Sequence, residues 1–342
     1  MEQASDEAIL RQQPKGTSKA VSLRQLQPLS VFMLTAVLWV VSIAHSNEAS
    51  LWLSNLLTYA AGVGIIACGM TFVMVAGGFD LSVGSIAAVC GVVVVLVMQK
   101  LAGAGASTAI PLAALVTLAA GSLLGAINGC LIAYAGVNPF VVTLSNMFVF
   151  RGLGLVLTSG GQSQVVPIQL TESFRLVYWG GFRFLGLVIA TPVLVFAAVF
   201  VVCLCVLGFT RFGHYTYATG GNEQASWLAG VNTKRVTTIT YIVSGLTCAI
   251  AATLWTALST TAQASDYQGK EMIVIASVIV GGTPLGGGRG GLFSTLSGLL
   301  LLCTIDQLLT QFGVDPQYRQ IVTGLIIVSV VAIDSYLRRA SQ

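Results

Sequence analysis

The sequence predicts an all-α integral membrane protein, and the observations behind this prediction are its composition and the length of its apolar blocks. Of 342 residues, 55% are hydrophobic and only 8% are charged, whereas roughly 25% of residues are charged in an ordinary soluble domain. So few charged side chains cannot give a soluble fold its polar surface. Many apolar blocks also reach the length of about 18 residues that a helix needs to cross the hydrocarbon. These observations exclude a soluble enzyme.

The apolar blocks predict about ten membrane-spanning helices. The eighth block is shorter than a full crossing, so we expect there either a broken helix or one that begins earlier. The predicted spans are residues 29–45, 51–76, 82–99, 109–134, 139–158, 184–209, 236–258, 272–282, 292–312 and 317–336.

The Lys and Arg residues outside the spans predict the orientation. With the N-terminus inside, ten of them fall on the cytoplasmic side and four on the outer side, and cytoplasmic loops normally carry the excess. Both termini are therefore predicted to be cytoplasmic, in a multi-pass protein of the inner membrane. The inner set comprises Arg11, Lys15, Lys19, Arg24, Arg211, Lys234, Arg235, Arg289, Arg338 and Arg339, and the outer set Lys100, Arg175, Arg183 and Lys270.

The predicted organisation is simple. A cytoplasmic tail at 1–28 precedes a membrane domain at 29–336, which contains a cytoplasmic loop at 210–235, and a second cytoplasmic tail occupies 337–342. No small-residue cleavage site follows the first apolar block, so we expect the first span to be an uncleaved anchor.

A short repeated motif indicates an internal duplication. The string GVNP at 136–139 joins the fourth and fifth spans, and GVDP at 313–316 joins the ninth and tenth. In the predicted topology these connections lie on opposite sides of the membrane. An inverted repeat that relates spans two to five with spans seven to ten would produce this placement, although two unrelated helix breaks would also explain it.

Five polar residues within or beside the spans are candidates for a translocation path. Each is costly in hydrocarbon and should face the bundle interior or a watery path, and side chains of these types also hydrogen-bond sugar hydroxyls. Two structural alternatives stay open. Asp80 or Ser82 could cap the helix that starts at 82, and Arg151 could pair with Asp306. The candidates are Asp80, Asn128, Asn146, Arg151 and Asp306.

Several other patterns favour structural roles. Gly121, Gly125 and Gly129 recur every four residues, a spacing typical of close helix packing. The seven cysteines all lie in apolar segments and there are only two histidines, so we expect no metal or redox site. GGGRGG at 286–291 fits the dinucleotide fingerprint only formally, since no βαβ unit surrounds it, and is expected to be a flexible turn. No P-loop occurs, and no clustered basic face indicates nucleic-acid binding.

The loop at 210–235 is the most informative polar segment. Asn222 is a good N-cap, Glu223 suits the first turn of a helix, and Gly230 suits the position just after its end. These signals predict a short capped helix that offers Trp227 and Leu228 to its surroundings. Docking to a partner protein and anchoring at the membrane interface both explain such an exposed tryptophan.

Three motifs give the sequence a specific resemblance. AGGFDLSVGS at 76–85, ATGGNEQASWLAGV at 218–231 and IASVIVGGTPLGGGRG at 275–290 are similar to segments of the permease subunits of bacterial ATP-binding-cassette importers for simple sugars, the family of ribose, arabinose and galactoside permeases. The resemblance covers nearly the whole chain. It implies a monosaccharide as cargo, a second permease protomer, a separate ATPase subunit that binds the ATP, and a periplasmic sugar-binding protein. It implies no cofactor bound by this chain.

The resemblance also gives the loop a role. It implies that Gly221, Asn222, Glu223, Ala225 and Gly230, with Trp227 beside them, contact the ATPase subunit. Gln224 and Ser226–Trp227 depart from the family pattern, which affects the fine fit to the ATPase. The alternative functions are an ion-coupled secondary transporter, with Asp80, Arg151 and Asp306 as coupling charges, and a membrane scaffold that transports nothing.

Overall fold

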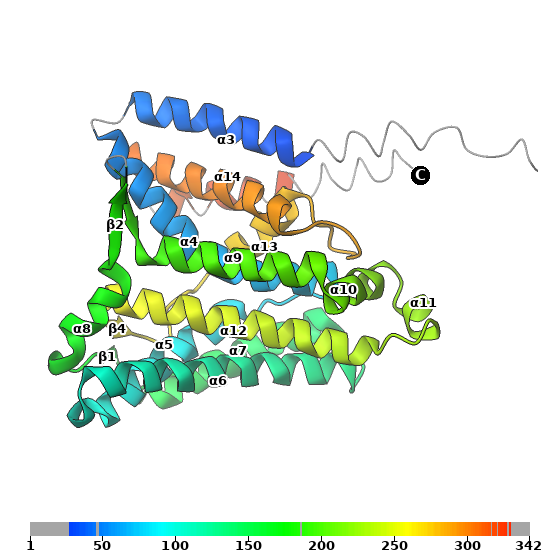
Figure 1. Ribbon diagram of the computed structural model, residues 1–342, viewed down its shortest axis with the longest axis horizontal. Helices are drawn as coiled ribbons and strands as arrows, with labels where there is room; N and C mark the ends of the chain where they lie inside the picture. The colour runs from blue at the N-terminus through cyan, green and yellow to red at the C-terminus, as the bar shows by residue number, and fades with distance from the viewer. Residues whose placement is uncertain are drawn as a thin grey trace, which may run out of the picture.

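Long apolar helices form most of the chain, as the composition predicted (Figure 1). The computed structural model describes residues 27–45, 48–184, 187–315, 317–319, 321–326 and 328–329. The helices are α3 (Gln27–Ala44), α4 (Ala49–Val75), α5 (Val83–Lys100), α6 (Ala106–Ala133), α7 (Pro139–Leu157), α8 (Ile168–Trp179), α9 (Thr191–Phe209), α10 (Arg211–Gly221), α11 (Glu223–Leu228), α12 (Thr233–Ser259), α13 (Lys270–Gly281) and α14 (Leu292–Gln311).

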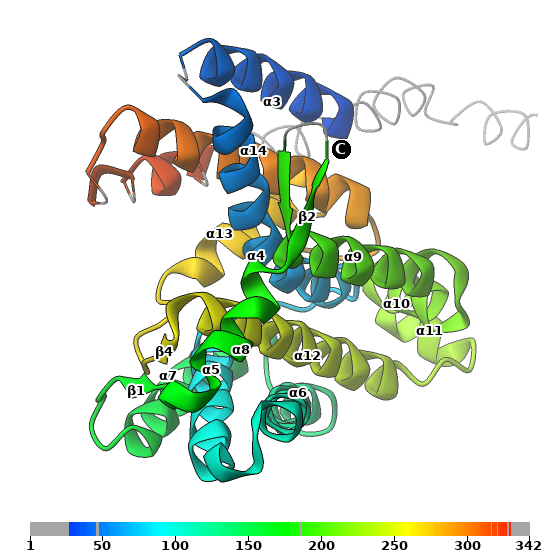
Figure 2. The same ribbon diagram turned by 60° about the vertical axis from the view of Figure 1, so that its left-hand side comes forward.

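In the described part of the chain, two small strand pairings accompany the helices. Strand β1 (Gln164–Val165) pairs with β4 (Thr261–Ala262), and β2 (Gly181–Phe184) pairs with β3 (Leu187–Ala190), both antiparallel. These strands and α8 lie at one end of the helix bundle, and α10 and α11 lie at the other (Figures 1 and 2). We refer to these as the hairpin end and the α11 end.

Seven helices in the described part of the chain are long and apolar enough to cross a membrane, and α3 adds a shorter apolar one. The all-α membrane class is confirmed, whereas the count of ten spans is not. Of the tenth predicted span, residues 317–319, 321–326 and 328–329 are helical. Residues 1–26 and 337–342 lie outside the described residues, and α3, the first helix that the structure describes, begins at Gln27, inside the predicted tail.

The arrangement places α4 and α5 in the core and α9 at the periphery. Most of α4 and α5 is buried. Helix α9 is apolar all round, yet side chains such as Val201 and Val202 are more than half exposed in the isolated chain. A long apolar surface of this kind is stable against hydrocarbon and not against water. The fold therefore presents α9 to lipid.

Glycines bring α6 and α12 into backbone contact, as the four-residue spacing predicted. A Cβ atom on Gly125 would lie 2.2 Å from the carbonyl oxygen of Tyr241, and one on Gly245 would lie 2.0 Å from that of Gly121. In lipid, burying apolar side chains between helices gives little hydrophobic stabilisation, because the lipid tails are equally apolar. Membrane helices gain packing energy from such close approach instead.

One predicted span needs correction, and the short eighth span shifts by only two residues at its start. The span at 184–209 begins with the β2–β3 hairpin, and α9 starts only at Thr191, where Pro192 favours a helix start. Gly180 and Gly181 form the preceding turn, and a side chain on Gly181 would collide with the carbonyl of Ile189. The eighth span is short, as predicted: α13 begins two residues earlier, at Lys270, and ends at Gly281 after 12 residues.

The two copies of the repeated motif lie at opposite ends of the bundle, as an inverted repeat requires. Gly136 follows α6, whose end lies at the α11 end, since Lys234 sits over the ring of Tyr134. Gly313 follows α14, where Phe312 packs against His45 near the start of α4. Both glycines have positive φ. Asn138 caps α7 by accepting a hydrogen bond from the N–H of Phe140.

We predict that Gly125→Val lowers the melting temperature of the detergent-solubilised protein, because the added side chain meets the α12 backbone. Overpacking of this kind costs about 1–3 kcal/mol. Gly152→Val is the matched control, since nothing lies within 4 Å of a Cβ at Gly152. Equal losses of melting temperature in the two variants would contradict the proposed contact.

Candidate functional site

The predicted capped helix is present, but a second helix precedes it. Asn222 accepts a hydrogen bond from the N–H of Ala225 at 2.8 Å and caps α11, with Glu223 in the first turn. Gly230 has a φ of +85° just beyond the helix end. Thr210 caps α10 in the same way through the N–H of Gly213 at 3.2 Å. The loop is therefore a pair of helices, and Thr210 was the sequence signal for the first one.

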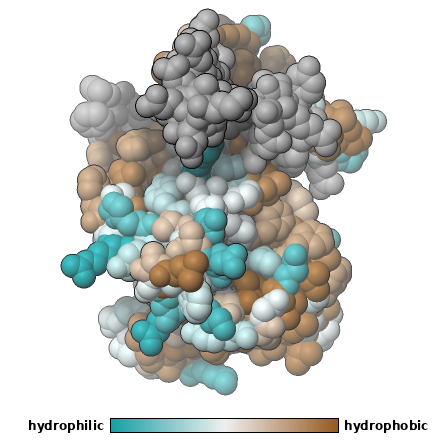
Figure 3. Space-filling model, turned by 90° about the vertical axis from the view of Figure 1, so that its right-hand side faces the viewer, coloured by the Kyte–Doolittle hydropathy of each residue, from teal (hydrophilic) through white to brown (hydrophobic). Residues whose placement is uncertain are grey.

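Helix α11 exposes an apolar tip at the α11 end. Trp227 and Leu228 are 65% and 74% exposed, and Trp227 borders a cavity of about 450 Å³ that continues along residues 230–234. This end of the molecule is rich in polar residues, with a small apolar patch among them (Figure 3). Exposed apolar side chains within a polar rim are typical of a protein-docking surface.

Two glycine-containing turns contact the last turn of α10; we name this contact the glycine junction (Gly77, Gly220 and Gly286–Gly291). The N–H of Gly288 donates to the carbonyl of Val75 at 2.8 Å. A Cβ on Gly220 would lie 1.9 Å from the same carbonyl oxygen, and one on Gly287 would lie 2.6 Å from Gly77. Only glycine permits such close approach of one backbone to another.

A tyrosine adds a side-chain contact to the glycine junction. The hydroxyl of Tyr217 on α10 donates to the carbonyl of Gly290 at 2.8 Å, and burial raises the pKa of Tyr217 above its ordinary value, so the hydroxyl stays protonated and donates. The segment at 286–291 is thus a closely packed turn and not the flexible one that the sequence predicted.

Three of the predicted path residues meet in one buried hydrogen-bonded network. Ser82 donates its hydroxyl to Asp80 at 2.6 Å, Asn128 donates to Ser82 Oγ at 2.7 Å, and Asn146 donates to Asn128 at 2.6 Å. Ser244 on α12 donates to the other oxygen of Asp80 at 3.1 Å. This network (Asp80, Ser82, Asn128, Asn146 and Ser244) connects α5, α6, α7 and α12.

Asp80 forms a turn directly before α5, and neither Asp80 nor Ser82 caps the first turn of that helix through its side chain. Asp80 accepts a hydrogen bond from the N–H of Ser82 at 2.9 Å, directly before α5. Ser82 occupies the N-cap position but makes no side-chain capping bond, because its hydroxyl is engaged by Asp80 and Asn128. Asp80 is fully buried.

Arg151 and Asp306 do not pair with each other. Arg151 donates to the backbone carbonyls of Ala264 and Asp266 and so fixes the connection between α12 and α13. Burial raises the pKa of Asp266, although the Gln263 N–H and Arg151 act in the opposite direction. Asp306 lies 3.9 Å from Arg319 instead. The alternative pairing of Arg151 with Asp306 is therefore wrong.

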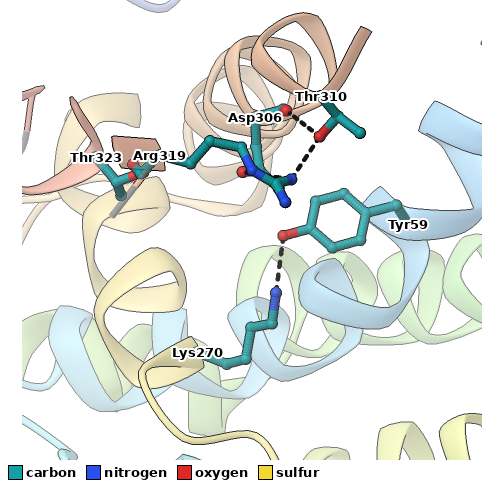
Figure 4. Close-up of polar contacts among 6 residues, drawn as sticks. All are labelled: Tyr59, Lys270, Asp306, Thr310, Arg319 and Thr323. Carbon is teal, nitrogen blue, oxygen red and sulfur yellow. Dashed lines mark hydrogen bonds and ion pairs between the residues drawn. The ribbon is translucent and has the colours of Figure 1, made fainter. Parts of the chain in front are cut away.

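Asp306 belongs to a charged cluster that sequence reasoning did not predict (Figure 4). The Lys270 ammonium donates to the hydroxyl of Tyr59 at 3.0 Å and lies over its ring, and the Arg319 guanidinium donates to Thr310. Lys270 was assigned to an outer loop, and Tyr59 carries no sequence signal that separates it from a lipid-facing tyrosine. We name Tyr59, Lys270, Asp306, Thr310 and Arg319 the charged cluster.

Glu271 is a further residue that sequence reasoning missed. Its side chain is 8% exposed and its Oε1 accepts from the N–H of Gly269 at 3.2 Å. Its Oε2 has no hydrogen-bond partner among the described residues and lies against Gly84, near the start of α5. A lone glutamate at the start of a helix is most simply explained by the helix dipole, so only the structure reveals its burial.

The fold and these sites define a multi-pass membrane permease, and comparison with known proteins identifies the family. The family model described as "Branched-chain amino acid transport system / permease component" matches residues 52–331, so the chain belongs to this permease family. No solved structure matches the chain.

Similar curated proteins include permeases for two pentose sugars. The ribose import permease protein RbsC of Escherichia coli K12 is 34% identical over 93% of this chain and 95% of its own length. RbsC of Bacillus subtilis is 36% identical over 91% of this chain and 93% of its own length. The L-arabinose transport system permease protein AraH of E. coli K12 is 32% identical over 82% of this chain and 81% of its own length. These relatives agree with the family resemblance that the three sequence motifs indicated.

Proposed function

We infer that the chain is the membrane permease subunit of an ATP-binding-cassette importer that carries a monosaccharide, driven by a separate ATPase subunit. The observation that carries this proposal is the exposed tip of α11, in a chain whose relatives are ribose and arabinose permeases. The residues proposed to contact the ATPase are Gly221, Asn222, Glu223, Ala225, Trp227 and Gly230. The α11 end is then cytoplasmic and the hairpin end faces outward, in the inner membrane.

The proposed mechanism is alternating access powered from the α11 end. When ATP closes the ATPase pair, α11 moves with the surface on which it docks. The glycine junction passes this displacement to the end of α4 and to the connection between α13 and α14. A second permease protomer and a periplasmic sugar-binding protein complete the assembly. In alternating access the permease opens to one side of the membrane at a time. The change between the inward-open and outward-open states is a switch between two discrete helix packings, because close-packed helices do not deform continuously.

Asp80, Asn128 and Asn146 gain a specific part in this mechanism. Their network lies directly after the α4 end that contacts the glycine junction, and it connects α5 to α6, α7 and α12. A displacement of residues 76–82 therefore reaches four helices through side chains that are already hydrogen-bonded. Asp306 and Arg151 remain proposed path residues, the first in the charged cluster and the second at the connection between α12 and α13.

We predict that sugar uptake into vesicles requires ATP and the co-expressed ATPase, and that it persists in the presence of an uncoupler while ATP is maintained. The physical reason is that the driving force arrives through α11 and not through an ion gradient. Loss of uptake on addition of the uncoupler alone would favour the ion-coupled transporter.

We predict that Glu223→Lys and Gly221→Asp each abolish co-purification of the ATPase while the permease still inserts in the membrane. Both residues are exposed, and nothing lies within 4 Å of a Cβ at Gly221, so the folded chain accommodates either change. Glu172→Lys, at an exposed position on α8, is the matched charge reversal at the hairpin end and should leave co-purification unchanged. Wild-type recovery of the ATPase with both α11 variants would contradict the proposed docking site.

We predict that Gly220→Ala separates ATP hydrolysis from transport. The added Cβ meets the Val75 carbonyl and opens the glycine junction, whereas α11 stays free to dock. ATPase co-purification should be retained and uptake should fall by an order of magnitude or more. Gly208→Ala is the control, because nothing lies within 4 Å of its Cβ position; an equal loss of uptake in this variant would show that the effect is not specific to the junction.

A further inference from the structure

A polar cavity of about 490 Å³ opens at the hairpin end between the start of α4 and the end of α14. Its volume falls within the roughly 300–1,000 Å³ of small-molecule sites. Leu51, Trp52 and Asn55 line it from α4, Gln307, Thr310 and Gln311 line it from α14, and His45 and Glu48 line it just before α4. The location follows from neighbouring contacts: the N–H of Val188 on β3 donates to Ser54 at 3.2 Å. We name this space the outer cavity.

Two buried polar groups beside the outer cavity lack hydrogen-bond partners among the described residues. Trp52 is only 6% exposed, and its indole N–H has no acceptor. The Oε1 atom of Gln311 has no donor, although Nε2 of the same side chain donates to the carbonyl of Ser42 at 3.3 Å. Buried polar atoms are rarely left unpaired, and each exception calls for a missing partner. One group is a donor and the other an acceptor.

The charges of the charged cluster, beside the outer cavity, are already engaged with one another (Figure 4). Lys270 is bonded to Tyr59 and interacts electrostatically with Asp306, and Arg319 engages both Asp306 and Thr310. The rest of the lining offers an indole and three side-chain amides, together with the carboxylate of Glu48 and the imidazole of His45. Amides donate and accept at once, a carboxylate accepts, and an indole presents an apolar face with a single donor. This set can pair with the hydroxyls of a neutral, polyhydroxylated molecule, and the Glu48 carboxylate disfavours an anion.

The polar residues also continue inward from the outer cavity. Trp52, Asn55 and Tyr59 lie three and four positions apart on α4, which places them on one face of the helix. Asp306 lies one residue before Gln307 on α14. The stripe therefore leads from the hairpin end to Lys270, at the start of the short helix α13.

We propose that the outer cavity is the site at which the permease first binds a neutral monosaccharide. This inference rests on the proposed function, which supplies the cargo class and the outward orientation. Asn55, Gln307 and Glu48 pair with the sugar hydroxyls. Rotation of the buried Trp52 and Gln311 side chains toward the cavity then lets the sugar accept from the indole N–H and donate to Gln311 Oε1.

The test uses cysteine protection in the full-length permease. The exposed Cys130 and Cys205 are replaced by alanine, and Leu51→Cys introduces a thiol at a lining position that makes no proposed hydrogen bond. Right-side-out vesicles without binding protein are treated with a membrane-impermeant maleimide, with and without D-ribose or L-arabinose at high concentration. We expect at least one of these pentoses to slow labelling several-fold. Ser173→Cys, exposed on α8, should be labelled at the same rate throughout.

A second substitution makes the result specific. Adding Trp52→Leu to the Leu51→Cys protein should remove the protection, whereas adding Trp255→Leu, at a partly exposed tryptophan of α12, should retain it. Labelling that neither pentose changes, protection equal to that by the osmolyte glycine betaine, or a thiol that a second protomer keeps unlabelled would each overturn the assignment. ATP-dependent uptake by the parent protein is measured in parallel. Intact uptake without protection overturns only the site, whereas absent uptake for both sugars overturns the proposed function.

Discussion

Hydrocarbon offers the polypeptide backbone no hydrogen-bond partners, and the architecture of this permease depends on that constraint. Every spanning segment must bond its own N–H and C=O groups, which makes it a helix. Irregular backbone is tolerated only where protein surrounds it. The connection at 76–82 and the start of α5 meet this condition, because Asp80, Ser82 and Val83 are fully buried. The short α13 meets it as well, since nearly all of its residues from Val274 to Gly281 are buried.

The same constraint explains the importance of glycine in the fold. Helices gain little in lipid from burying apolar surface against one another, so close backbone approach supplies the packing energy. Between α6 and α12 this contact fixes two spans together. In the glycine junction it joins two connections to the last turn of α10. A junction built from backbone has few rotamers to absorb a displacement, and it therefore transmits motion better than a contact between flexible side chains would.

What the sequence could predict follows from the range of the interactions involved. Local sequence signals were sufficient to predict the long apolar helices, the Asn222 cap and the short α13. The cost of polar groups in hydrocarbon correctly predicted that Asp80, Asn128 and Asn146 face inward. It could not give their partners, because hydrogen bonds between distant spans depend on helix rotation and depth. The wrong pairing of Arg151 with Asp306 and the unpredicted partnership of Lys270 with Tyr59 have this cause.

The hairpin at 181–190 was missed for a different reason. Its second strand, Leu187–Ala190, is apolar and is followed directly by the apolar α9. Hydropathy alone therefore predicts one continuous span. Turn chemistry gave the available signal, in the paired glycines at 180–181 and the Thr191–Pro192 helix start. Local backbone rules therefore outweigh hydropathy at the ends of spans, where water begins to satisfy the backbone.

Helix α4 connects the two functional ends of the molecule. Its last residue, Val75, accepts the hydrogen bond of the glycine junction, and its first turns carry Trp52 and Asn55 at the outer cavity. Its 27 residues extend over about 40 Å at 1.5 Å per residue. A buried, uninterrupted helix of this length moves as one body, so a shift at the α11 end changes the outer cavity directly. Coupling between the two ends then needs no chain of side-chain contacts. The element whose position depends on both the glycine junction and the outer cavity is α4 itself.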